Sequence, residues 1–198
     1  MKTGWIPILL LTLSGSAVAA DLTVYLTSDG GTTTFGVKTI ASSIFEKAGI
    51  AIAWGKGPAP TVQTSGFWLH VVLAEGTPDE LLPGALGAAY PFAGCSKTIT
   101  VFYDRVRKLC RRPDEEMALL AYVLAHEVGH VLEALDRHSV EGVMKASWST
   151  EDRAKIASRH LQFLEEDVLL IRQGLAGGCR RQTELMDRFG SGSALHPE

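Results

Sequence analysis

The chain has 198 residues, a formal net charge of −3 at pH 7 and hydrophobic residues at 46 % of its positions. This length and composition are typical of one domain with one hydrophobic core. No block of lysine and arginine interleaves with aromatic residues, and no segment after the first twenty residues is apolar enough to anchor in a membrane. We therefore expect neither a nucleic-acid partner nor a stable membrane anchor. The protein is also expected to be a monomer.

The first segment, residues 1–20, predicts a secretory signal peptide. Lys2 gives a positive start, residues 6–13 form a short apolar run, and small residues at 17–20 suit a cleavage site. The apolar run is shorter than the roughly 20 residues that span a bilayer. We expect a secreted or periplasmic protein whose mature chain begins at Ala20 or Asp21.

The N-terminal half of the remaining chain predicts strands around one helix. Alternating or continuously apolar residues predict strands at 22–27, 50–54, 67–74 and 98–103. Residues 33–48 have the apolar spacing of a helix, and Gly49 suits its C-cap. Two stretches rich in glycine and proline, 55–65 and 78–95, are predicted loops.

The C-terminal half predicts two helices. Pro113 and the acidic residues after it open a helix that is apolar almost all round, so we expect it to be buried centrally. A loop at 136–148 follows, and Ser149 with Asp152 gives a capping-box start to a last helix at about 150–173.

These elements predict an α+β fold. Its small, mostly four-stranded sheet would carry an N-terminal helix, a buried active-site helix and a C-terminal helix. The domain would span residues 21–173, and residues 174–198 would form a flexible tail.

The three cysteines are Cys95, Cys110 and Cys179. In an exported protein this odd number predicts one disulfide and a spare thiol, or three thiols. Cys95 and Cys110 flank a predicted strand and are the expected pair. No two cysteines have CxxC spacing, which argues against a cysteine-based zinc site.

The sequence His126-Glu127-Val128-Gly129-His130 carries the chemistry. Histidines four residues apart lie on one face of a helix, so both imidazoles can reach one ion. Glu127 lies beside them, where its carboxylate can contact a metal-held water without binding the metal. Zinc lowers the pKa of such a water to about 7, and the carboxylate accepts its proton. The pattern predicts a zinc-dependent hydrolase with Glu127 as its catalytic base.

A catalytic zinc site needs a third protein ligand and keeps one position for water. Glu133, Asp136 and His138 follow the motif closely. Glu133 is one helical turn beyond His130 and points partly away from it, so we rank it last. Asp136 and His138 lie where the chain can turn back. We favour His138, because imidazole is the commoner partner of two histidines, and keep Asp136 as the alternative.

The run HEVGHVLEALDRHSVEGVM resembles the metzincin zinc peptidases, especially the matrixins, whose pattern is HExxHxxGxxH followed by a methionine turn. The resemblance implies that His126, His130 and His138 bind zinc, that Glu127 is the general base, and that Met144 is the methionine under the metal. The order of predicted elements is also similar to that of a metzincin core.

Two departures from the family pattern concern the third ligand. Glu133 occupies the position of the glycine that lets the helix stop, and His138 comes two residues later than the family's third histidine. Asp136 stands at the family spacing and resembles the HExxHxxGxxD variant of snapalysin. Without the glycine the helix should run longer and the ligand should come later, which favours His138.

The predicted function is a secreted zinc-dependent endopeptidase that hydrolyses peptide bonds through a metal-activated water. Its peptide or protein substrate would lie extended and pair with an exposed strand edge, for which residues 98–103 are the candidate. Trp148 is expected to pack against the last helix, with a place in the lining of the specificity pocket as the alternative. Two alternatives keep the metal: a zinc hydrolase of non-peptide amides, and a catalytically inactive exported domain that zinc stabilises. The intact Glu127 argues against the second.

Overall fold

The computed structural model describes residues 20–28, 34–60, 67–76, 80, 82–90 and 97–189, with no side chains for residue 97 or for 178–189. The predicted signal peptide, apart from Ala20, lies outside these residues. No helix in the described part of the chain has the length and apolar character needed to cross a membrane.

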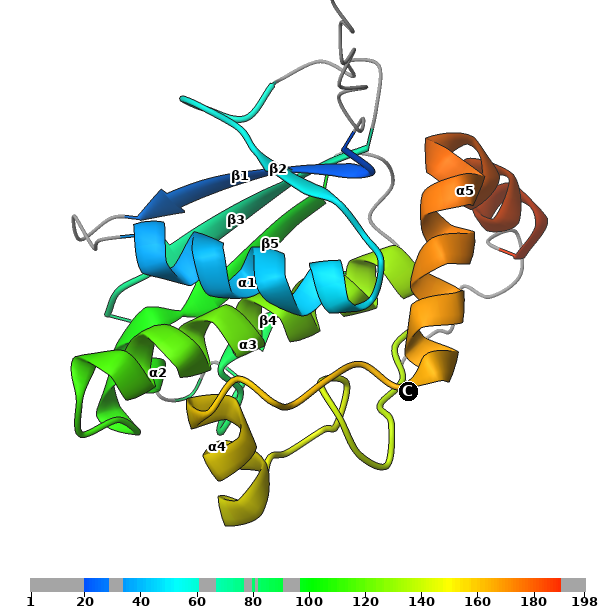
Figure 1. The fold of residues 1–198 in the computed structure, drawn as a ribbon. Helices are drawn as coiled ribbons and strands as arrows, with labels where there is room; N and C mark the ends of the chain where they lie inside the picture. The colour runs from blue at the N-terminus through cyan, green and yellow to red at the C-terminus, as the bar shows by residue number, and fades with distance from the viewer. Residues whose placement is uncertain are drawn as a thin grey trace, which may run out of the picture.

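A five-stranded sheet has the order β2-β1-β3-β5-β4 (Figure 1). Its strands are β1 (Leu22–Ser28), β2 (Ile52–Trp54), β3 (Trp68–Ala74), β4 (Gly87–Ala88) and β5 (Lys97–Phe102). Four strands are parallel, and β4 runs antiparallel to β5. The four predicted strands are present, so the expected α+β class holds.

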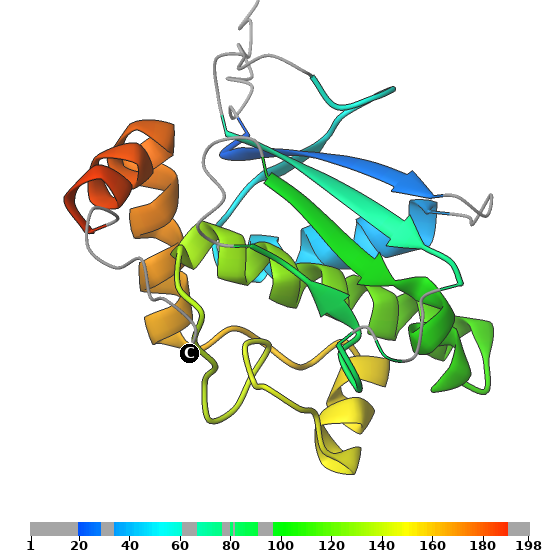
Figure 2. The same cartoon turned by 180° about the vertical axis from the view of Figure 1, so that it is seen from behind.

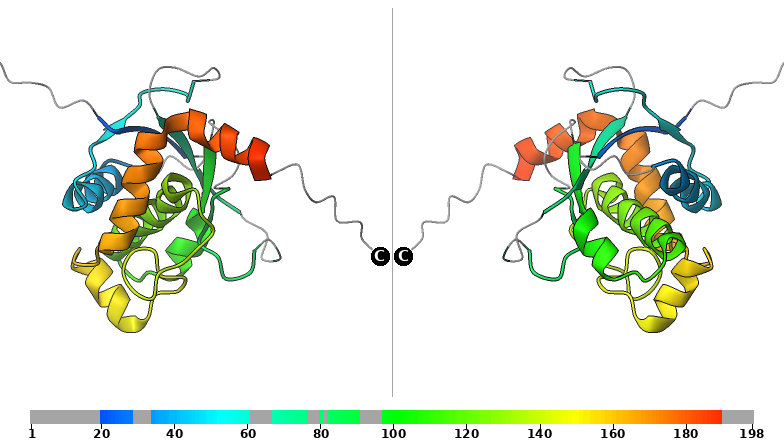
Figure 3. Two further views of the ribbon diagram at one scale, coloured as in Figure 1. Left: turned by 90° about the vertical axis from the view of Figure 1, so that its right-hand side faces the viewer. Right: turned by 90° about the vertical axis from the view of Figure 1, so that its left-hand side faces the viewer.

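Two helices cover one face of this sheet, α1 (Phe35–Lys47) and α3 (Pro113–Glu133) (Figures 1 and 2). Gly49 ends the first with φ of +69°, as its sequence position predicts. Almost every residue of α3 from Ala118 onward is buried, because α1 and α5 flank it and the sheet lies behind it (Figure 3). The prediction of a central, buried helix is confirmed.

The single last helix of the prediction is wrong. The structure has two helices there, α4 (Thr150–Ala157) and α5 (Glu165–Phe189). Ser149 and Asp152 form the predicted capping box, but Arg159 takes φ of +62° and ends the helical path. Leu161 and Phe163 are then buried on alternate positions of an extended segment. Leu161 and Leu164, three residues apart, also fit the apolar stripe of a helix, which explains the error.

Helix α5 extends beyond Gly174, where the sequence predicts a tail, and continues to Phe189. Glycine weakens a helix by about 1 kcal/mol relative to alanine but does not by itself end it. The predicted boundary between domain and tail is therefore not the end of the helix.

Two short elements have no counterpart in the prediction. Helix α2 (Tyr103–Lys108) follows β5 directly, and β4 lies within a stretch predicted as loop. Strand β4 pairs Gly87 with Val101 and Ala88 with Thr100. This pairing covers part of β5, so residues 98–103 are not the free edge that the sequence analysis expects. Gly-Ala carries no strand pattern of its own.

Arg105 holds the chain that leads into β4. The guanidinium Nη1 donates to the carbonyls of Leu82 at 2.7 Å and Ala85 at 2.9 Å. Next along this segment, the backbone N–H of Phe102 donates to the carbonyl of Leu86 at 2.9 Å. These contacts join residues about twenty positions apart in the chain, so no local sequence pattern predicts them.

Cys110 carries a free thiol among the described residues, and its expected pairing with Cys95 involves a residue outside them and stays a prediction. Burial raises the pKa of this thiol above its ordinary value. Cys95 and the side chain of Cys179 lie outside the described part of the structure.

Candidate metal centre

Three histidines meet at the C-terminal end of α3. His126 and His130 come from successive turns of the helix, and His138 comes from the loop that follows. One nitrogen from each ring lies within 4.8 Å of the other two. The Nε2 atoms of His126 and His130 are 3.0 Å apart, and the ring of His138 stacks 5.3 Å from that of His126.

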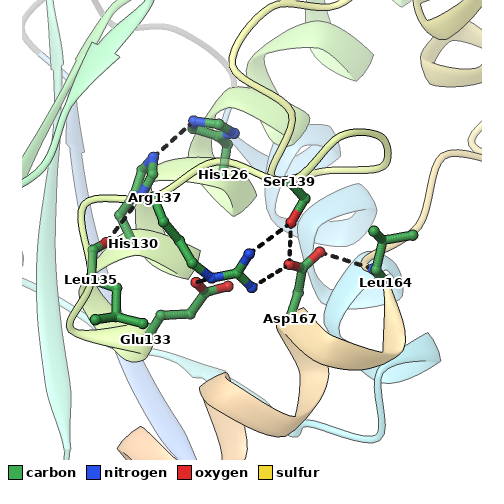
Figure 4. A network of polar contacts seen from close by, with 8 residues as sticks. All are labelled: His126, His130, Glu133, Leu135, Arg137, Ser139, Leu164 and Asp167. Atoms are coloured by element: carbon green, nitrogen blue, oxygen red, sulfur yellow. Dashed lines mark hydrogen bonds and ion pairs between the residues drawn. The ribbon is translucent and has the colours of Figure 1, made fainter.

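Backbone carbonyls fix the two helical imidazoles, and Figure 4 shows the contact of His130 with Leu135. The Nδ1 atom of His126 lies 2.8 Å from the carbonyl of Val143, and Nδ1 of His130 lies 3.4 Å from that of Leu135. A carbonyl only accepts hydrogen bonds, so we assign the ring proton to Nδ1 in both cases. Each Nε2 atom is then left with a free lone pair that faces the other.

This donor set fits a divalent cation. Two imidazole lone pairs 3.0 Å apart cannot hydrogen-bond to each other, whereas an ion between them is bound by both. Burial lowers the pKa of His126 to about 4 and also lowers that of His130. Both rings are therefore neutral at pH 7, the form that binds zinc.

The other two ligand candidates lie elsewhere. Asp136 lines the same cleft but does not belong to the group of three side chains that converge. Glu133 is turned away, towards Arg137, whose Nε lies 3.1 Å from its Oε2. Helix α3 persists through Glu133, and Ala134 makes the turn with φ of +53°. The turn thus comes one residue after the family's glycine position.

Glu127 lies between the histidines and strand β4. It is 8 % exposed, and burial raises its pKa to about 7. Its side chain packs directly on Gly87, where a Cβ atom would lie 2.7 Å from both Cγ and Oε1 of Glu127. Only glycine leaves room there for this carboxylate. Sequence reasoning did not single out Gly87, because it lies forty residues away in a predicted loop.

A cleft of about 980 Å³ runs past these residues. One wall comes from the segment around β4, and the opposite wall comes from residues after Met144, among them Trp148. The ring of Trp148 lies 5.7 Å from that of His126 and 6.5 Å from that of Tyr122, edge to face in both pairs. Trp148 therefore lines the cleft, which is the alternative place that its sequence position suggested.

Met144 is fully buried. Its Sδ atom lies so close to Gly129 that a side chain there would overlap it. Its backbone carbonyl accepts a hydrogen bond from Ser139 N at 2.8 Å. Met144 thus packs the loop after α3 against that helix at Gly129, between the two helical histidines in sequence; the methionine-turn role itself stays a prediction.

The fold is similar to that of a solved structure, archaemetzincin from Methanopyrus kandleri. The two share 17 % identity with a TM-score of 0.52, over 78 % of this chain and 96 % of that one. No protein-family model matches the chain, and no curated protein matches it. At this identity the likeness concerns the fold.

Proposed function

We propose that this protein is a zinc-dependent hydrolase of peptide bonds, in which His126, His130 and His138 hold the metal and Glu127 is the general base. The main observation behind this proposal is that three imidazoles converge beside a buried carboxylate in one open cleft. The motif resemblance to metzincins and the fold likeness to an archaemetzincin support the proposal independently of each other.

The residues divide the chemistry between them. Zinc bound by the three imidazoles would supply Lewis-acid activation of a water molecule and of the scissile carbonyl. Glu127 accepts the proton of the attacking water and passes it to the leaving amine. Burial raises the pKa of Glu127 to about 7 in the metal-free protein, and a cation bound beside it would lower that pKa and favour the ionised form that accepts a proton.

An extended peptide fits the cleft along β4, which is the outermost strand on this side of the described sheet. Seven large hydrophobic side chains are exposed among the described residues, and three of them, Leu82, Tyr90 and Leu109, line this cleft. Such clustering of exposed apolar groups is typical of a binding surface. We infer a peptide or protein substrate with apolar side chains near the scissile bond.

The site of action is a separate proposal. The signal-peptide pattern of residues 1–20 supports a secreted or periplasmic protein. N-terminal sequencing of the exported protein is expected to give Ala20 or Asp21 as the first residue, and an uncleaved N-terminus would contradict it.

Glu127→Gln tests the proposed activity. We expect the variant to bind zinc as the unmutated protein does and to hydrolyse an unfolded protein substrate about 10² to 10⁴ times more slowly. Glu75→Gln is the control, because Glu75 pairs with Arg107 outside the cleft; it should keep the unmutated rate. An unchanged rate in Glu127→Gln would show that Glu127 is not the base.

The same assays separate the alternatives. Activity on small amides but not on peptides would favour a hydrolase of non-peptide amides. Stabilisation by zinc without turnover of either class would favour a zinc-stabilised binding domain.

A further inference from the structure

We propose that Asp167 positions His138 by holding the residues on either side of it, and we call Arg137, Ser139 and Asp167 the bracket. The inference rests on the proposed function, because it assigns His138 the role of third metal ligand. It explains how a chain without the family's glycine, and with a longer spacing, places its third imidazole.

Both neighbours of His138 bind one oxygen atom (Figure 4). The Nη2 atom of Arg137 lies 2.8 Å from Oδ1 of Asp167, and the hydroxyl of Ser139 donates to the same Oδ1 at 2.5 Å. Arg137 Nη1 also donates to Ser139 Oγ at 3.1 Å. The three side chains thus form a closed triangle around one carboxylate oxygen.

This arrangement directs His138 to the opposite side. In extended chain, successive side chains point in opposite directions, and residues 136–138 form no helix. The side chains of Arg137 and Ser139 both reach Asp167 on α5, so the side chain of His138 between them points away from α5. That is the side on which His126 and His130 lie.

Asp167 is itself fixed. Its side chain is fully buried, and its second oxygen, Oδ2, accepts from the backbone N–H of Leu164 at 2.9 Å, which caps the start of α5. Helix α5 lies so close to the end of α3 that a side chain at Gly174 would overlap the carbonyl of Leu132. The carboxylate therefore has a set position relative to His130.

Arg137 itself is held on two sides. Its guanidinium lies between two carboxyl groups whose side chains are both fully buried, those of Glu133 and Asp167. Its Nε is 3.1 Å from Glu133 Oε2, and its Nη2 is 2.8 Å from Asp167 Oδ1. A guanidinium paired with the buried carboxylate of Asp167 is costly to move, which restricts the loop.

Without the bracket His138 would belong to a free loop. Its ring is exposed, so packing alone does not hold it. Each backbone residue that zinc must order costs conformational entropy, which weakens binding. The bracket orders this loop before the metal binds, and its loss should therefore weaken zinc binding.

A double-mutant cycle tests whether the bracket acts through His138. Zinc affinity of the full chain is measured by competition with a chromophoric chelator for the unmutated protein, Arg137→Ala, His138→Ala and the double variant. We expect Arg137→Ala to weaken zinc binding about 10- to 100-fold, the range for residues that orient metal ligands. In the His138→Ala background the same change should have no more than about a twofold effect.

Controls keep the test decisive. Arg112→Ala removes an exposed arginine that also contacts two carboxylates, those of Asp114 and Glu115, and should leave zinc affinity unchanged. Asp167→Asn keeps the side-chain volume. It replaces Arg137→Ala in the double-mutant cycle if circular dichroism shows that Arg137→Ala does not fold.

Equal losses with and without His138 would overturn the bracket while leaving the zinc site intact. Failure of the unmutated protein to bind zinc would overturn the proposed function, and this inference with it.

Discussion

The substitution Gly87→Ala tests the position of Glu127 without changing the metal ligands. It adds one methyl group beside the carboxylate and leaves all three proposed ligands as they are. The new Cβ would lie 2.7 Å from Cγ and Oε1 of Glu127, whereas ordinary contact begins at 3.4 Å. Either Glu127 or β4 must then move by about 0.7 Å. The added methyl thus acts directly on the proposed base.

A displacement of about 1 Å costs about 10²-fold in rate, so we expect kcat/KM to fall roughly 10- to 100-fold. Zinc affinity should not change, because Glu127 is not a ligand in this account. Peptide hydrolysis under kcat/KM conditions and chelator competition for zinc measure the two quantities on the same preparation.

Gly76→Ala is the matched control for this experiment. It adds the same methyl group at a glycine that does not line the cleft and has nothing within 4 Å, but at φ of +67°. We expect it to cost about 1 kcal/mol of stability through backbone strain and to leave kcat/KM close to the unmutated value. An unchanged kcat/KM in Gly87→Ala, or an equal loss in Gly76→Ala, would refute the argument from overlap with Glu127.

Three further predictions concern the site and its surroundings. In the zinc-free protein, the raised pKa of Glu127 means that its contribution to stability is present below pH 4.5 and lost as pH rises through about 7. Glu127→Gln should therefore show a smaller fall in Tm between about pH 5 and 8 in chelator, and an identical pH profile would contradict this cause. Gly129→Ala should lower the free energy of unfolding by about 1–3 kcal/mol, because the new methyl overlaps buried Met144; denaturant titration measures it, and no loss would show that Met144 moves freely. Trp148→Ala should raise KM for peptides and widen the accepted side chains in a peptide library, since its ring forms a wall of the cleft beside His126; an unchanged preference would place substrate elsewhere.

The elements that sequence patterns predicted are those with a repeating apolar signal. The strands and the helix from Pro113 bury many successive side chains, so their patterns are long and clear. Strand β4 has two residues, Gly87 and Ala88, and it exists because Val101 and Thr100 pair with it. The split of the last helix was missed because Leu161 fits a helical spacing with Leu164 as well as an extended spacing with Phe163.

The candidate site divides in the same way. His126 and His130 were predictable because the helical period fixes their separation. His138 was predictable because only three possible ligands follow the motif closely and imidazole is the commoner partner of two histidines. Gly87 and Asp167 were not predictable: each acts on the site through contacts with residues about thirty to forty positions away. Such contacts depend on the packed fold and leave no local signal in the sequence.

X-ray absorption at the zinc edge of the zinc-loaded protein tests the three-imidazole site most directly. The account predicts about one zinc per chain, with three imidazole nitrogens at about 2.0–2.1 Å and one further light atom from solvent. A spectrum dominated by sulfur at about 2.3 Å, or failure to take up stoichiometric zinc, would contradict it.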